Sequence, residues 1–246
     1  MLKRFRADLH LHTCLSPCAE LDMTPRGIVD AARSRGVDII AVTDHNSAEN
    51  VEATRRAAEG TEIGVLGGME ISTAEEVHII ALFERPEDIL MMQGIVYENL
   101  PSGLNDERLY GQQVVVNEHD EVLGFNTRLL ITATRLGTNA LVDVIGSLGG
   151  LAIASHVDRE AFSIITQLGF IPETVKLDAL EFSALVRRED AEVRFSALAA
   201  FPWVSFSDAH HVADIGRRVT TFTIEEPTFA EVRMALGGKD GRGIAW

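Results

Sequence analysis

The chain has 246 residues, of which 46% are hydrophobic, and it carries a formal net charge of −15. This length suits one domain of the β/α-barrel class, and the composition is apolar enough to bury a large core. The acidic balance argues against a broad surface for long duplex nucleic acid, because neutralising phosphates requires clustered lysine and arginine. No apolar run approaches the roughly 18 residues of a membrane span, and no signal-peptide pattern opens the chain. We therefore expect a cytoplasmic protein with no membrane contact.

Short β-rich runs alternate with helical runs over the first third of the chain, which is typical of parallel strands joined by helices. Thr24 precedes Pro25 and predicts a helix start there, with its end near Gly36. Ser47 is expected to cap a second helix that ends at Glu59. Strands are expected over residues 5–12, 37–43, 63–65, 77–83, 151–155, 179–182, 204–207 and 219–224, with Thr228 capping a closing helix.

The alternation is weaker between Pro86 and Asn139. Residues 112–125 alternate around a polar stretch and predict a hairpin. We therefore expect a single domain over residues 1–246 with an insert at about 95–135. Binding loops vary around a rigid scaffold, so we expect residues of this insert to determine substrate specificity.

The strongest chemical signal is the run Asp8-Leu9-His10-Leu11-His12 in the first strand. Strand alternation would turn Asp8, His10 and His12 to one face, where two imidazoles can share a metal ion. Asp8 could then orient one of these ligands. Two histidines packed at a strand end are the alternative interpretation.

The other metal-ligating residue types fall in or beside further predicted strands. Since strand ends converge at one mouth of a β/α barrel, they can reach a shared metal site. A metal centre is therefore a better interpretation than scattered structural polar groups. These residues are Asp44, His45, Glu70, His78, His156, Asp208 and His210.

The ordered segments DLHLHT, TDHN, GGMEIST with VHIIALF, ASHVDR and SDAHH resemble the successive motifs of the PHP (polymerase and histidinol phosphatase) family. The resemblance extends over most of the chain apart from 86–139. It implies a distorted (β/α)7 TIM-like barrel of the α/β class, with two or three divalent metal ions (Zn, Fe or Mn). It also implies hydrolysis of phosphate esters by a metal-bridging hydroxide.

The resemblance also implies a ligand set. The first metal would be bound by His10, His12, Glu70 and Asp208; Glu70 would bridge to a second metal at His78 and His156; His45 and His210 would face a third. Cys18 stands where family members commonly have another histidine, so it either completes the third site or is an inert cysteine.

Arg159 is the best placed cation for binding a substrate phosphate, with a surface salt bridge as its alternative role. Glu181 is expected to point to the same mouth and could bind a substrate hydroxyl or orient a ligand. His119 lies in a polar run that reads as a solvated turn, not a ligand site.

The leading interpretation is thus an enzyme, a metal-dependent phosphoesterase, with Glu70, Asp208 and Arg159 central to catalysis. Its substrate would be a small phosphate ester, either a nucleotide, a phosphorylated metabolite or a short single-stranded oligonucleotide cleaved from an end. The alternatives are a non-catalytic metal-binding regulatory or partner-binding module and an amidohydrolase-like C–N hydrolase. The second is weakened because no strand offers an evident lysine for carbamylation.

Overall fold

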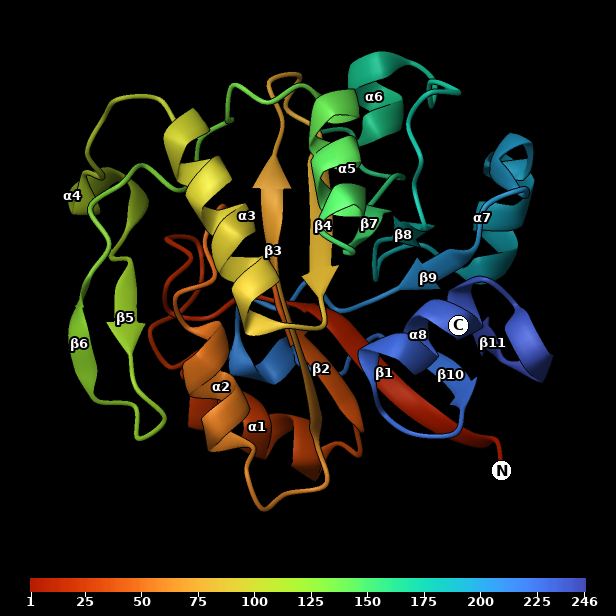
Figure 1. Cartoon of the computed structure of the whole chain (residues 1–246), viewed down its shortest axis with the longest axis horizontal. Coiled ribbons are helices and arrows are strands. Elements are labelled where there is room, and N and C mark those ends of the chain that lie inside the picture. The colour runs from red at the N-terminus through yellow and green to blue at the C-terminus, as the bar shows by residue number, and fades with distance from the viewer.

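The computed structural model describes all 246 residues as a mixed α/β fold around one nine-stranded sheet (Figure 1). The sheet order is β11-β10-β1-β2-β3-β4-β7-β8-β9, and β5 and β6 form a separate two-stranded sheet. The elements are β1 (Lys3–Leu11), α1 (Pro25–Ser34), β2 (Ile39–Val42), α2 (Val51–Ala57), β3 (Gly64–Ser72), β4 (His78–Phe83), α3 (Pro86–Asn99), α4 (Glu107–Tyr110), β5 (Val114–Val116), β6 (Val122–Phe125), α5 (Thr138–Ser147), β7 (Leu151–Ala154), α6 (Ile164–Leu168), β8 (Ala179–Phe182), α7 (Arg188–Arg194), β9 (Trp203–Ser205), β10 (Thr220–Ile224), α8 (Phe229–Leu236) and β11 (Gly243–Ala245), with short 3-10 turns at Ser196–Leu198, Val212–Asp214 and Lys239–Gly241.

The sheet curls into a nearly closed barrel. Leu11 at the end of β1 forms a parallel bridge to Ala209, just beyond β9, so the first strand meets the last parallel one. Successive residues of a strand belong to different cores: Ile80 and Leu82 join a cluster drawn from most strands and covered by α8, whereas Ile79 packs outward under α3 and α5. The expected TIM-like barrel is confirmed.

The strand directions depart from the expected parallel order in two places. The last expected strand, β10, runs antiparallel to β1 and pairs with β11 in the same way. The other departure is next to the histidine cluster. β4 is antiparallel to both β3 and β7, so β3 and β4 form a hairpin and not a βαβ unit. Its tight turn is held by Thr73, whose backbone N–H donates to the Val77 carbonyl and whose hydroxyl accepts from the Val77 N–H. This reversal brings the start of β4 to the edge where the neighbouring strands end.

Two helix starts gave different outcomes. Thr24 accepts a hydrogen bond from Gly27 N–H at the start of α1, as expected. The expectation for Ser47 is wrong, because α2 starts four residues later and the Ser47 hydroxyl bonds to the Tyr97 hydroxyl at 2.6 Å. Tyr97 belongs to α3, a helix that the weak pattern after Pro86 did not predict.

The expected hairpin is confirmed as β5 and β6, which lie at the margin of the molecule, apart from the barrel (Figure 1). None of the helices is both long and apolar enough to cross a membrane.

Gly68 marks the closest backbone approach within the β3–β4 hairpin. A Cβ atom at Gly68 would clash with the carbonyl oxygen of Ala81, which is backbone and cannot turn away. We expect Gly68→Ala to lower the free energy of unfolding by about 1–3 kcal/mol, through the strain of overpacking. Gly146→Ala is the control, because its Cβ meets nothing within 4 Å in helix α5 and should be neutral or stabilising. Urea unfolding of both variants decides the matter, and equal stabilities would contradict this assignment.

Candidate metal centre

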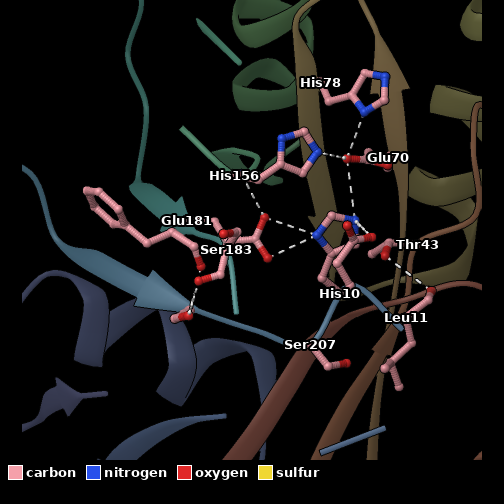
Figure 2. A network of polar contacts seen from close by, with 12 residues as sticks. His10, Leu11, Thr43, Glu70, His78, His156, Glu181, Ser183 and Ser207 are labelled. Atoms are coloured by element: carbon pink, nitrogen blue, oxygen red, sulfur yellow. Dashed lines mark hydrogen bonds and ion pairs between the residues drawn. The ribbon is translucent and has the colours of Figure 1, made fainter. Parts of the chain in front are cut away.

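Glu70, near the end of β3, is 1% exposed and lies at the centre of a histidine cluster. Figure 2 shows three of these imidazoles, from β1, β4 and the end of β7, pointing at its carboxylate. Glu70 Oε1 lies 3.1 Å from His78 Nδ1, 3.3 Å from His156 Nε2 and 3.4 Å from His10 Nε2, and Glu70 Oε2 lies 3.2 Å from His45 Nδ1 and 3.5 Å from His12 Nε2.

Asp208 provides the second carboxylate, on the other side of the β1 histidines. Its Oδ1 lies 3.3 Å from His12 Nε2, 3.4 Å from His10 Nε2 and 3.6 Å from His210 Nδ1. Its Oδ2 forms an ion pair with the half-buried guanidinium of Arg159, at 2.7 Å from the Arg159 Nη2 atom. The cluster therefore carries two carboxylates, six imidazoles and one cation at its edge.

The backbone is strained where the ligands leave their strands. His156 follows β7 with a φ of 31°, and Asp208 follows β9 with a φ of 50°. Left-handed φ values are unfavourable for residues with a Cβ and persist only where the surrounding structure enforces them, as at active sites. In β1 the pairing with β2 shifts register between Asp8 and Leu11, and irregularities of this kind re-aim side chains.

The rings of the two β1 histidines are oriented by side chains outside the cluster. The His10 Nδ1 atom lies 3.0 Å from both oxygens of Glu181, as Figure 2 shows. His12 Nδ1 donates to the Ser16 hydroxyl at 2.9 Å, and that hydroxyl in turn donates to Asp44 at 2.7 Å. Such contacts favour a proton on Nδ1, which would leave Nε2 of each ring free to ligate a metal ion.

Protonation in this cluster suits metal binding. Burial lowers the pKa of His12 to about 4, and burial also holds the pKa of His45 well below its ordinary value. Burial would raise the pKa of Glu70, but the neighbouring His78 and His10 hold it well below its usual range. Neutral imidazoles and charged carboxylates are the forms that ligate divalent metals.

His10 differs from the other imidazoles. Burial lowers its pKa, but the carboxylates of Glu181, Glu70 and Asp208 outweigh burial and raise the pKa well above the ordinary value. A cation placed between these carboxylates would take over the role of that proton.

Unpartnered polar atoms test whether metal ions fit here. His45 Nδ1, Glu70 Oε1 and His78 Nδ1 are buried and make no hydrogen bond. Such atoms cost free energy unless something satisfies them, and all three face one another. Metal ions fit this donor set. Three overlapping groups have their ligand atoms within 4.8 Å of one another: His10, His12 and Asp208; His45, Glu70 and His78; and His12, His45 and His210.

The ligand set expected from sequence lies together, but the grouping differs for two histidines. His156, expected beside Glu70 and His78, lies 3.3 Å from Glu70 but belongs to none of the three groups. His45 was placed beside a third metal alone, but it also lies with Glu70 and His78. Cys18 is exposed and belongs to none of the three groups.

The remaining residues that the sequence singled out lie outside the metal-ligand groups. Asp8 was expected to orient a ligand side chain, but its carboxylate accepts from the backbone N–H groups of Ser207 and Gly216 instead. Asp44 binds the turn after β1, where it accepts from the Thr13 N–H and hydroxyl. His119 lies exposed in the turn between β5 and β6, away from the cluster.

Sequence reasoning did not single out Ser16, Asn46 or Phe162. The Asn46 amide donates to the carbonyls of Leu130 and Thr132, which ties the end of the insert to the residue after His45. Phe162 stacks on His78 with 4.5 Å between ring centroids. Serine, asparagine and phenylalanine are common outside functional sites, so only the fold shows these roles.

Comparison with known proteins identifies the family. A sequence model of the PHP domain matches residues 8–169, which is more than half of the chain. The chain belongs to the PHP family. The expected phosphoesterase resemblance is therefore confirmed at the level of the family.

Curated proteins resemble parts of this chain. An uncharacterized protein of Methanocaldococcus jannaschii is 31% identical over 110 residues, covering 42% of this chain and 57% of the relative. A 3′,5′-nucleoside bisphosphate phosphatase of Chromobacterium violaceum is 31% identical over 91 residues, covering 36% of this chain and 31% of the relative. The chain thus spans less than two thirds of the length of these relatives.

Among solved structures, endonuclease Q from Pyrococcus furiosus superimposes with a TM-score of 0.75 at 18% identity, covering 98% of this chain and 58% of the endonuclease. Endonuclease Q has also been solved with a 27-mer duplex substrate that carries an abasic lesion. At this identity the likeness supports the fold.

Ser16 offers a test of the ligand-orienting network. We expect Ser16→Ala to weaken divalent metal binding by about 10- to 100-fold, because His12 Nδ1 and the His45 N–H lose their shared acceptor. Calorimetric titration of metal-stripped protein with Mn²⁺ measures this. Ser147→Ala, which removes an exposed hydroxyl on α5, is the control. Unchanged affinity in Ser16→Ala would show that the network does not position His12.

Proposed function

We propose that this PHP protein is a metal-dependent hydrolase of phosphate esters. The observation that supports it most is the buried Glu70 carboxylate, which faces five imidazoles while its Oε1 lacks any hydrogen-bond partner. A purely structural cluster would satisfy these atoms within the protein, because orphaned buried polar groups are costly. The family match and the phosphatase name of one relative support the same reaction class.

The chain's own residues would divide the work as follows. The imidazoles of the cluster and the carboxylates of Glu70 and Asp208 would hold two or three divalent ions of Zn, Fe or Mn. When bound, such ions polarise phosphate oxygens and acidify water. The guanidinium of Arg159 pairs with Asp208 at the edge of the cluster, and about a third of the Arg159 side chain is exposed. Its planar guanidinium can therefore bind a phosphate oxygen from the solvent side.

A small phosphorylated molecule is the substrate class we propose, in line with the nucleoside bisphosphate that one relative's name gives. Our expectation that long duplex nucleic acid is excluded is not confirmed, because endonuclease Q shares this fold and has been solved with duplex DNA. Net charge describes the whole surface and says little about a mouth that holds cations.

The test pairs elemental analysis of the purified protein with a screen for phosphate release. After Mn²⁺ supplementation, the screen takes nucleotides, sugar phosphates, short oligonucleotides and a duplex with an abasic site. Two or three metal ions per chain with turnover would establish the enzyme and its substrate class. Bound metal without turnover on any of these would favour the regulatory module instead.

Glu70→Gln keeps the shape of the side chain and removes its charge. We expect this variant to lose bound metal and to hydrolyse no faster than metal-stripped wild type, because Glu70 contacts every imidazole of the cluster except His210. His119→Ala, in the exposed turn of the insert, should keep wild-type rates. Equal loss in both variants would refute this map of the site.

Metal removal should also destabilise the fold. A ligand that binds only the native state at 100 times its dissociation constant adds about 2.7 kcal/mol to the free energy of unfolding. We expect Mn²⁺ at that excess to stabilise wild type by this amount, and Glu70→Gln by much less, in urea unfolding with and without chelator. The same stabilisation in both proteins would place the metal elsewhere.

A further inference from the structure

The loop that joins β7 to α6 is strained at both ends. It begins at His156, with a φ of 31°, and ends at Phe162, with a φ of 60°. A bulky aromatic residue is an outlier in the left-handed region. Such strain persists only where the surrounding structure enforces it, and it is concentrated at functional sites. The loop is therefore expected to do more than connect β7 to α6.

Hydrogen bonds hold this loop in place at several points. The carboxylate of Asp158 accepts from the N–H and hydroxyl of Ser183, at 2.7 and 2.6 Å, in the loop after β8. The Thr166 hydroxyl donates to the Arg159 carbonyl at 2.7 Å, and Ser163 caps α6. Arg159 and Phe162 are therefore presented on a preorganised segment.

Phe162 is placed at the edge of the metal cluster. Its ring stacks on the imidazole of His78, with 4.5 Å between centroids and 17° between planes, and its carbonyl accepts from the His78 N–H at 2.9 Å. His78 Nδ1 in turn faces Glu70 at 3.1 Å. Yet 44% of Phe162 is exposed, so much of the ring surface is still open to solvent.

We propose that Phe162 is a stacking platform for a planar ring in the substrate, a nucleobase, while Arg159 on the same loop binds the phosphate. This inference rests on the proposed function and narrows its substrate class to nucleotides and short single-stranded oligonucleotides. Open aromatic faces bind bases of any sequence, and each stacked base contributes about 1–3 kcal/mol. A sugar phosphate lacks the ring and gains nothing from Phe162.

The alternative role for Phe162 is support of His78 alone. In that case the loss of the ring would disturb the metal ligand, and all phosphate esters would be affected alike. A platform predicts a different result, because only ligands that carry a base would respond. The two roles are separated by a pair of ligands that differ in the base and in nothing else.

The experiment measures equilibrium binding of adenosine 5′-monophosphate and of ribose 5-phosphate to Mn²⁺-loaded protein by calorimetry, both as methylene phosphonate analogues whose C–P bond a phosphoesterase cannot hydrolyse. We expect wild type to bind the nucleotide more tightly. Phe162→Ala should weaken nucleotide binding by about 5- to 150-fold, the equivalent of one lost stack, and leave ribose 5-phosphate unchanged. Phe162→Trp should retain the preference. Phe170→Ala, which removes another exposed phenyl ring beyond α6, is the control and should match wild type.

Equal weakening of both ligands in Phe162→Ala, or a loss of its bound Mn²⁺, would overturn the platform in favour of support for His78. Equal affinities of wild type for the two ligands would overturn it as well. Because binding is measured without turnover, a wild type that prefers the nucleotide yet hydrolyses nothing would refute the proposed function and keep the stacking site.

Discussion

A single buried carboxylate sets the conditions for the rest of this structure. Glu70 cannot be ionised in the barrel interior without compensation, since a buried charge is costly unless it is paired or bound to metal. Its partners are five imidazoles from four places in the chain: two from β1, one from each of the segments that follow β2 and β7, and one from the start of β4. The reversed direction of β4 serves the same pairing. Because β4 runs antiparallel to β3, its first residue, His78, lies at the edge of the sheet where β3 ends and can reach Glu70.

The mouth of the barrel is fixed by acidic side chains that accept backbone N–H groups from a neighbouring segment. Asp44 accepts from Thr13, Asp8 from Ser207, and Asp158 from Ser183. Glu181 does the same for His156 while it also contacts the His10 ring. These contacts offset the strain of left-handed residues at the mouth, so that ligands leave their strands at angles that relaxed backbone would not give.

The candidate ligands could be predicted from the sequence better than the path of the chain. Histidine and acidic residues at apolar strand ends are rare enough to be singled out, and all eight expected His, Asp and Glu ligands lie in one cluster. The direction of β4 could not be predicted in this way, since a short apolar run reads the same in both directions. Ser16 and Phe162 were missed because their roles depend on contacts with His12 and His78 that only the folded chain brings about.

The segment that follows β6 lies a short path from the candidate metal centre. Asn46, itself left-handed with a φ of 51°, binds the carbonyls of Leu130 and Thr132 and accepts from the Ser72 N–H. Its neighbour His45 contacts Glu70, so the segment at residues 130–132, beyond β6, is anchored one residue from a candidate ligand. The far side of the insert differs, because Leu123 on β6 is 68% exposed and packs against little. Substitutions at Leu123 should therefore cost little stability, whereas changes near residue 130 would disturb Asn46 and, through it, the position of His45.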